Sequence, residues 1–531
     1  MKKRTAARSM AALMGAAMVL TACGGGNTTA PTTGASSGGE TQTASESAES
    51  GKITKTDIIV GQASDIVTLD PAGQQDTTSG VLMKHAYSTL LDVDNEGKVV
   101  PDLAESYEMK SDTEYVFKLR EDACFWDGTP VTAQDVKFSL DRAKGMPKTK
   151  SNTSKIEEVT VNGDHEVTIK LTEPYAAFKT IVTQHNLSIL SEKAVTEAGD
   201  SYGDVDNLLG SGPFKVTEWV PNDHYTLVRN DNYWGEMPIA TSITCRVIPE
   251  GSARTIALEA GEIDVVWSVD PTDCANVESN PDVKLLSQPS TGIDYVGMNT
   301  QKEKFSDKRV RQAINYALDK QAFVDTIIEG RGLVANSYIN STIPGWSEEE
   351  EAYPYDPEKA KELLAEAGYP DGFECSIFVN GDLRTRSAQI LQAQLADVGI
   401  KVDISTYEWG ALLDTLNAGE HEMFLLGWSN TSFDPDGSTY QLFYSGNHGA
   451  TGNRAFFSND KVDELILSAQ RESEESKRME LYKELQFVLH EESPWCPLYY
   501  KNDNVGVRAD LKGFKLHKGA QHYLGNCHYE K

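Results

Sequence analysis

Three apolar runs in the C-terminal half of the chain alternate with stretches of helical periodicity. The runs cover 373–379, 401–407 and 422–428, and the predicted helices extend from about Thr385 to Val398 and around Ala411–Ala418. Apolar runs of this length are typical of buried strands. The resulting β-α-β-α-β order favours a parallel sheet with right-handed crossovers.

Two loops leave the carboxyl ends of neighbouring strands in this unit, at residues 380–386 and 427–437. In open parallel sheets, ligands bind beyond the carboxyl ends of the strands. We therefore expect the two loops to meet at one edge of the sheet, with Arg384 or Arg386 near Trp428. The second loop, GWSNTSFDPDG, is rich in turn-forming residues, so a plain surface turn is the alternative interpretation.

The N-terminal half of the chain has a different pattern, in which short strands prevail. Tyr115, Phe117 and Leu119 alternate with other residues in TEYVFKLR, which is typical of a half-buried strand. Thr132 is the predicted N-cap of a helix that follows. A chain of 531 residues is also too long for one core, so two or three domains are expected.

Composition and charge argue against two classes of protein. Hydrophobic residues make up 39% and charged residues 24%, which suits a soluble globular protein rather than a membrane bundle. The formal net charge is −31, and from Cys23 onward it is near −35 (45 basic and 80 acidic residues). Such a surface repels phosphate backbones, so nucleic acid is not expected as a partner.

The N-terminus has the pattern of a secreted lipoprotein. Residues 1–22 combine the basic start MKKRTAARS with an apolar run too short to span a bilayer, which predicts a signal peptide. The LTAC that ends at Cys23 resembles the bacterial lipobox, which implies lipidation of that cysteine; an ordinary secretory signal is the alternative. Residues 23–53 are rich in Gly, Ser and Thr and are predicted to form a flexible tether. The folded part would begin near Thr54, outside the cell and close to the membrane.

The sequence contains no recognised enzyme or metal signature. It lacks a G-x-S-x-G elbow, a G-x-x-x-x-G-K-[ST] phosphate loop and a G-x-G-x-x-G after a strand, and no cofactor or metal is predicted. The six cysteines after the lipobox are scattered, and their 15 possible pairings stay open. His517, His522, Cys527 and His528 could hold a metal, but their spacing fits no specific pattern. We interpret them as part of an exposed polar tail.

Sequence blocks spread over about 350 residues carry a family resemblance. They include TLDPAGQQDTTSG, YVFKLREDACFWDGTPVTAQDVKFSLDRA, GSGPFKVTEWVPNDHYTLVRNDNYWG, ALEAGEIDVV and ILQAQLADVGIKVDI, in this order. Together they resemble the family 5 extracellular solute-binding proteins, the dipeptide, oligopeptide and nickel receptors of ABC importers.

The resemblance implies an α/β fold of two hinge-linked lobes around a ligand cleft, of the class II periplasmic-binding-protein type, with an extra N-terminal subdomain. The implied boundaries are 54–92, 215–300 and 501–531 for lobe I, 93–214 for the extra subdomain and 301–500 for lobe II. The lobes would close over the ligand and present it to a membrane permease. No bond is made or broken, so the chain is not expected to be an enzyme, and a monomer is expected.

The resemblance also implies ligand contacts. Trp428 matches a tryptophan that lines the cleft of nickel receptors. Thr431 stands where dipeptide receptors carry the aspartate that takes the ammonium group of the ligand; because threonine carries no charge, this departure leaves the ligand open. Arg384 and Arg386 lie where peptide receptors supply a cation for the ligand carboxylate. The predicted ligand-binding residues are Gln74, His185, Arg384, Arg386, Trp428, Asn430, Thr431 and Asp434.

A lipoprotein receptor for short peptides is the leading hypothesis. Within the same class, the ligand could instead be a nickel chelate, an opine or an oligosaccharide. A secreted hydrolase would need a catalytic constellation that the sequence lacks, and a surface signalling or adhesion protein would keep the fold without transport. The expected partners are the solute, the permease subunits and the membrane, the last through the lipid anchor.

Overall fold

The computed structural model describes residues 52–531, so the predicted signal peptide, Cys23 and nearly all of the predicted tether lie outside the described residues. At the start of the described part, the backbone amide of Lys52 donates to the carbonyl oxygen of Lys531 (3.0 Å). Strand β1 (Ile53–Lys55) then pairs antiparallel with β19 (Tyr529–Glu530). In the described part of the chain, no helix is long and apolar enough to cross a membrane.

A large mixed sheet, of eleven strands over residues 52–531, runs through both lobes in the order β16-β15-β17-β13-β18-β12-β2-β11-β10-β9, with β14 also paired to β18. Its strands are β2 (Asp57–Gln62), β9 (Phe214–Val220), β10 (His224–Arg229), β11 (Ser242–Val247), β12 (Val265–Val266), β13 (Val283–Met298), β14 (Gly332–Val334), β15 (Glu374–Val379), β16 (Lys401–Thr406), β17 (Met423–Ser429) and β18 (Trp495–Arg508).

The predicted β-α-β-α-β unit is confirmed. Strand β15 pairs parallel with both β16 and β17, and α12 (Gly381–Ala396) and α13 (Trp409–Asn417) connect the three strands. Both helices begin earlier than predicted. Helix α13 begins at Trp409 because the Glu408 carboxylate accepts the amide of Gly410 (2.9 Å) and so caps the first turn. We call the part that carries this unit lobe II.

Lobe II is completed by helices that pack around these strands. Its core gathers Ile314, Leu391 and Met423 from different elements, all fully buried. The remaining helices of this part are α8 (Glu303–Ser306), α9 (Lys308–Ala317), α10 (Lys320–Thr326), α11 (Pro357–Glu366), α14 (Asp436–Phe443), α15 (Asp460–Arg471) and α16 (Glu475–Glu492).

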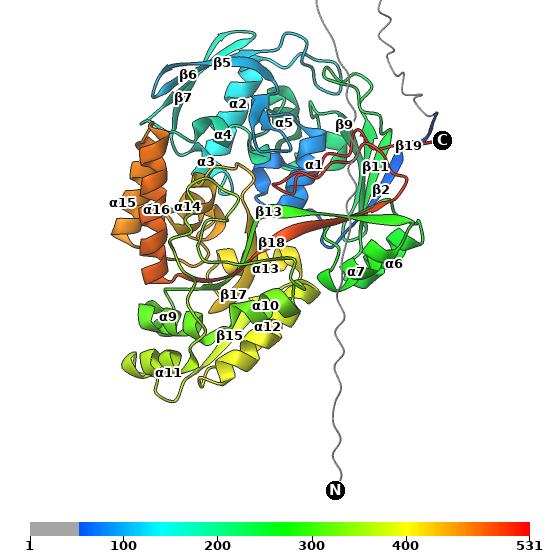
Figure 1. Cartoon of the computed structure of the whole chain (residues 1–531). Helices are drawn as coiled ribbons and strands as arrows, with labels where there is room; N and C mark the ends of the chain where they lie inside the picture. Colours follow the sequence, from blue (N-terminus) through cyan, green and yellow to red (C-terminus); the bar gives the residue numbers. More distant parts are fainter. Residues whose placement is uncertain (1–51) are drawn as a thin grey trace, which may run out of the picture. The chain divides into compact units, whose positions relative to one another are not determined.

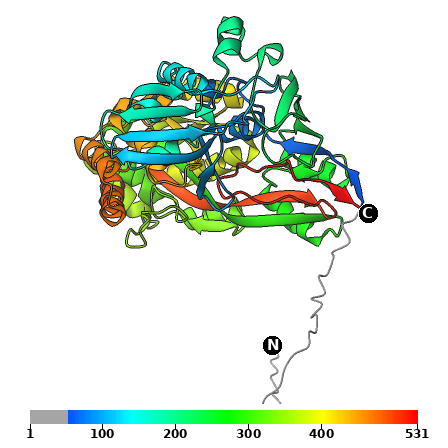
Figure 2. The same cartoon turned by 90° about the horizontal axis from the view of Figure 1, so that it is seen from above.

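Two long strands, β13 and β18, connect lobe II to lobe I, which carries β2, β9–β12, α1 (Thr77–Ala86), α6 (Gly251–Glu259) and α7 (Pro271–Ser279). They lie side by side and belong to both lobes (Figure 1, Figure 2). Their register shifts between Pro289 and Ile293, where β13 begins to pair with β17 on its other side. A break in the ladder at this point suits a hinge. The predicted lobe boundaries at 300 and 500 lie just after β13 and inside β18.

The segment predicted as an extra subdomain contains an antiparallel sheet in the order β5-β6-β8-β7. Its elements are β3 (Leu91–Val93), β4 (Val99–Pro101), β5 (Ala104–Ser111), β6 (Glu114–Leu119), α2 (Ala133–Lys144), α3 (Lys150–Thr153), β7 (Ile156–Gly163), β8 (Glu166–Leu171), α4 (Phe178–Ile181) and α5 (Glu192–Ala198). Tyr115, Phe117 and Leu119 are all buried, which confirms the predicted half-buried strand. Thr132 is the N-cap of α2, as predicted, and its backbone amide donates to Asp135 Oδ2 (2.9 Å).

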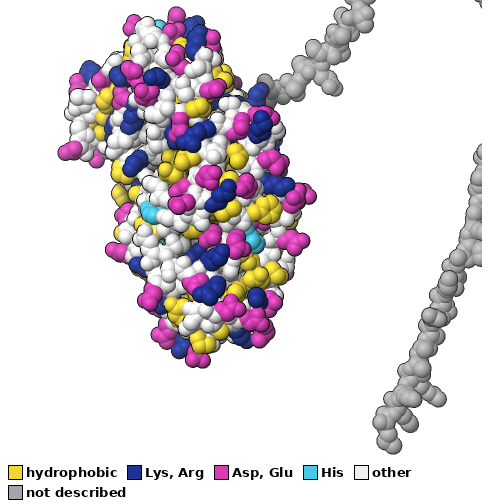
Figure 3. All heavy atoms as spheres, turned by 90° about the vertical axis from the view of Figure 1, so that its left-hand side faces the viewer, with side chains coloured by type: hydrophobic (Ala, Val, Ile, Leu, Met, Phe, Trp, Pro, Cys, Tyr) yellow, Lys and Arg dark blue, Asp and Glu magenta, His cyan; other side chains and the backbone are white. Residues whose placement is uncertain are grey.

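The C-terminal histidines correct the sequence interpretation. His517, His522 and Cys527 are buried rather than part of an exposed tail, because the C-terminal segment packs against α1: the amide of Leu524 donates to His85 Nε2 (3.0 Å). The six cysteines of the described part are free thiols. On the face that Figure 3 shows, acidic and basic side chains are interspersed.

Candidate ligand cleft

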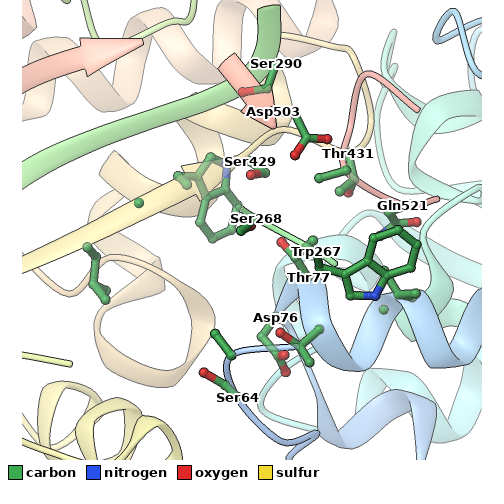
Figure 4. A pocket seen from close by; sticks show the side chains of 18 of the residues that line it. Ser64, Asp76, Thr77, Trp267, Ser268, Ser290, Ser429, Thr431, Asp503 and Gln521 are labelled. Carbon is green, nitrogen blue, oxygen red and sulfur yellow. The ribbon is translucent and has the colours of Figure 1, made fainter. Parts of the chain in front are cut away.

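A cavity of about 390 Å³ lies between the two lobes. Lobe I lines it with residues 62–64 at the end of β2, residues 74–78, 80 and 81 at the start of α1 and residues 267–269 after β12. Lobe II contributes residues from 380–384 and 426–431, and the subdomain contributes Asn152 and residues 184–186. Figure 4 shows labelled side chains from both sides, among them Asp76, Trp267 and Thr431, around one open space.

The two loops singled out by the strand order do meet here. Asn380 and Arg384 follow β15, Trp428 and Thr431 lie at and beyond the end of β17, and all four residues line the cavity. The site is therefore at the carboxyl edge of the parallel strands, as predicted. Gln74 and His185 line the same cavity. Burial lowers the pKa of His185 to about 4, so its imidazole is neutral at neutral pH.

Arg384 and Lys501 share one buried carboxylate. Asp294, on β13, is almost completely buried; Lys501 Nζ lies 2.8 Å from its Oδ2 and Arg384 Nε lies 3.8 Å from its Oδ1. The Arg384 guanidinium also donates to Asn380 Oδ1 (2.7 Å) and lies 5.9 Å from the centroid of the Trp409 ring. Two cations against one carboxylate leave one positive charge at this part of the cavity wall.

Arg386 has a different position from Arg384, although both are on α12. Its Nη2 donates to both carboxylate oxygens of Asp270 (2.9 and 2.6 Å), and Asp270 is the N-cap of α7 in lobe I. Burial opposes ionisation of Asp270, but its hydrogen bonds with Arg386 hold its pKa below the usual value. Arg386 thus joins the two lobes and does not line the cavity, so the structure gives it a contact other than the predicted one.

Asn430 and Asp434 are buried and are not among the residues that line the cavity. Asn430 Nδ2 donates to the Asp434 carbonyl (2.7 Å) and to Ser438 Oγ (2.8 Å). The Asp434 carboxylate forms a buried ion pair with Arg478 on α16, with Nη1 to Oδ2 at 2.9 Å. These bonds stabilise the conformation of the loop, so both residues have a structural role and do not line the cavity.

The same loop holds Trp428 and Thr431 in the cavity wall. Trp428 is half-buried, and its Nε1 donates to the carbonyl of Gly437 (3.2 Å), which orients the indole. Thr431 Oγ1 donates to Gln184 Oε1 of the subdomain (2.8 Å), so the residue in the place of the expected aspartate forms a contact between lobe II and the subdomain. A hydroxyl used in this way does not supply a charge to a ligand.

Lobe I contributes carboxylates that the sequence analysis did not single out. Asp76 caps α1 by accepting the amide of Ser79 (2.9 Å), its other oxygen has no hydrogen-bond partner in residues 52–531, and burial raises its pKa. Asp503 Oδ2 lies 2.9 Å from His522 Nε2. Since His522 Nδ1 accepts the amide of His517 (3.0 Å), the proton of the neutral ring is on Nε2.

Trp267 is a second residue that sequence reasoning could have found. It follows the apolar strand β12, as Trp428 ends the apolar strand β17, and it lines the cavity together with Trp409. The same pattern of an apolar run ended by tryptophan would have identified it. The walls therefore carry three indoles in addition to the charged groups, which suits an organic solute.

Comparison with known proteins identifies the family. Residues 98–450 match the model of the bacterial extracellular solute-binding proteins, family 5. The glutathione-binding protein GsiB of Shigella boydii is 32% identical over 477 residues, which are 86% of this chain and 91% of that protein. The chain belongs to this family.

Solved structures agree with the fold. The periplasmic binding protein DppA of Helicobacter pylori, in complex with the peptide STSA, has a TM-score of 0.85 at 28% identity, over 90% of this chain and 99% of that one. The binding protein AgaA of A. tumefaciens R10, in complex with agropinic acid, has a TM-score of 0.84 at 26% identity, over 90% and 99%. The predicted two-lobed periplasmic-binding-protein fold is confirmed. This family 5 protein is a solute-binding receptor of an ABC importer that acts outside the cytoplasm, and it is not an enzyme.

Proposed function

We propose that this family 5 receptor binds short peptides with free termini. The observation that carries the proposal is the distribution of charge: lobe I presents the carboxylates of Asp76 and Asp503, and lobe II presents the guanidinium groups of Arg384 and Arg454. A peptide carries an ammonium group at one end and a carboxylate at the other, so it can satisfy both walls at once. A cavity of about 390 Å³ is near the small end of the usual range of ligand pockets, which favours a short peptide.

Relatives that bind peptides support this choice, since GsiB binds glutathione and the solved DppA holds the peptide STSA. The AgaA structure favours one second candidate, a small acid such as agropinic acid. Thr431 removes the charge expected for amino-terminus capture in lobe II. In our proposal, Asp76 and Asp503 of lobe I take the ammonium group instead.

Binding would be coupled to closure of the lobes, because several contacts join the walls of the cavity. Gln75 Nε2 donates to Gln441 Oε1 (3.1 Å), and Gln441 Nε2 donates to Asn152 Oδ1 (2.6 Å), which links lobe I, lobe II and the subdomain. A ligand shifts the receptor to this state only if it binds the closed form better than the open form. A solute held by charges on both lobes meets that condition.

Mass spectrometry of the solute released by denaturation, after gentle purification of the full receptor, tests the proposal. We expect peptides of a narrow length range. A metal complex, a sugar or a small acid that is not a peptide would contradict it.

We also propose that lipidated Cys23 anchors the receptor to the membrane, on the basis of the LTAC sequence before a tether-like segment. Replacing the Cys23 thiol removes the sulfur atom to which the lipid would be attached. Cys23→Ser is therefore expected to release the protein from the membrane fraction, while Cys124→Ser, at a partly exposed cysteine, leaves it there. Continued membrane attachment of the Cys23→Ser protein would contradict the anchor.

A further inference from the structure

Arg454 is a buried cation in the cavity wall that has no ion-pair partner. Its side chain lines the cavity, yet the residue is only 6% exposed. Nε donates to Asn417 Oδ1 at the end of α13 (3.0 Å), and among residues 52–531 neither terminal nitrogen has a hydrogen bond or a carboxylate within ion-pair distance. Isolated buried charges are costly, and arginines in such places are normally paired.

The backbone around Arg454 holds the side chain in place. Its amide donates to the carbonyl of Gly452 (2.9 Å), and its own carbonyl oxygen lies 2.8 Å from Nε2 of the buried His421. Gly452 has a φ of 135°, which only glycine adopts readily, and a Cβ there would lie 2.6 Å from the carbonyl oxygen of Gln441. A guanidinium on such a fixed turn is preorganised to bind a ligand.

The neighbouring charges do not neutralise Arg454. Lys148 of the subdomain lies close enough to repel it, and Lys148 has no ion pair in the described part of the chain either. Asp76 attracts Arg454 electrostatically from lobe I but is not within salt-bridge distance. Burial lowers the pKa of both cations. Asp76 and Asp414 both attract Lys148, but in the described part of the chain neither carboxylate is within ion-pair distance of Arg454, so Arg454 remains unpaired.

Arg454 differs from Arg384 and Arg386 in that it has no carboxylate partner in the described part of the chain. Arg384 shares Asp294 with Lys501, and Arg386 is bound to Asp270, so each has a carboxylate of the protein nearby. Arg454 has none, and its two terminal nitrogens can bind a planar carboxylate in the bidentate manner.

We propose that Arg454 is the anion subsite of this receptor and binds a carboxylate of the solute. The proposal rests on the proposed function for the location of the ligand, and it adds that a free carboxylate is required. The amides of Gln441, Asn152 and Gln75, which line the cavity and bond to one another, bring the lobes together near this subsite.

Binding of a tripeptide library and of the same library as C-terminal amides tests the proposal. The wild type and Arg454→Gln are stripped of solute by unfolding and refolding, and affinities are measured by calorimetry. We expect the wild type to prefer the free acids roughly 10-fold or more, as is usual for a hydrogen-bonded charge, and Arg454→Gln to lose that preference. An unchanged preference in Arg454→Gln, or equal binding of the two libraries by the wild type, would overturn the assignment.

Two further variants control the experiment. Arg309→Gln makes the same replacement on the exposed start of α9, where Arg309 pairs only with Asp307, and should behave as the wild type. Arg454→Lys keeps the positive charge but loses the planar guanidinium group, so it should retain a weakened preference for the free acids. This variant also serves if Arg454→Gln does not fold. A full preference for the free acids in Arg454→Lys would contradict a bidentate contact.

A failure of the peptide proposal can be told apart from a failure of the Arg454 proposal. If the wild type binds neither library, the solute released from the purified protein is treated to form methyl esters and weighed. A solute that is not a peptide but has a carboxyl group, and is lost from Arg454→Gln, supports the subsite alone. A solute without a carboxyl group, retained equally by both proteins, overturns the subsite.

Discussion

The two walls of the cleft differ in charge. The lobe I wall carries the carboxylates of Asp76 and Asp503, whereas the lobe II wall carries the guanidinium groups of Arg384 and Arg454. Each wall alone would bind one end of a zwitterion weakly. In the proposed binding mode, the two walls hold both ends of the zwitterion only when the lobes meet, so the charges of the ligand would favour the closed form. Specificity would then come from the pair of walls.

Removal of the Trp428 indole should have the largest effect on ligand affinity, because stacking does not depend on which end of the solute is bound. Trp428→Ala is expected to weaken binding of the released solute by about 1–3 kcal/mol. Calorimetry on the refolded variant measures the loss. An unchanged affinity in a folded Trp428→Ala protein would remove this indole from the site.

Neutralising the lobe I wall should affect only solutes with a free ammonium group. Asp503→Asn keeps a side chain of the same size, and we expect a roughly 10-fold loss of affinity for a short peptide. The N-acetylated form of the same peptide should bind the variant and the wild type equally. A similar loss for both peptides would mean that Asp503 acts on the shape of the site through His522, and not on the ammonium group.

Removing the ion pair between Arg386 and Asp270, which joins the two lobes, should have the smallest effect on ligand affinity. Arg386 and Asp270 are partly exposed, with 36% and 14% of their side chains accessible, and such pairs contribute little. Arg386→Gln is expected to weaken binding by a factor of about 2–5, more at low salt than at high salt. If Arg386 contacted the ligand carboxylate, as the family resemblance implied, the loss would instead match that of Arg454→Gln and depend on the free carboxylate.

The sequence predicted the lobe II side of the site better than the lobe I side. The alternation of apolar runs and helices defined β15, β16 and β17, and from that order the meeting of Arg384 with Trp428 followed. Period-two and 3.6-residue patterns are local, so they are readable from the chain itself.

The remainder of the site depends on contacts between distant segments. Asp503 is on the last long strand, and its histidine partner is in the C-terminal segment, which was interpreted as an exposed tail. Whether an arginine is free or paired depends on where carboxylates such as Asp294 and Asp270 lie in space, and no local pattern gives that. For this reason the sequence does not distinguish Arg386 from Arg384, and it does not point to Arg454.

The claim that both walls act on a zwitterion is tested most directly by a single pair of peptides. One is a short peptide that the wild-type receptor binds, and the other is the same peptide with an acetylated amino terminus and an amidated carboxyl terminus. The account predicts that the doubly blocked peptide binds at least about 100-fold more weakly, since it lacks both charges. Equal affinity for the two peptides in calorimetry would contradict it.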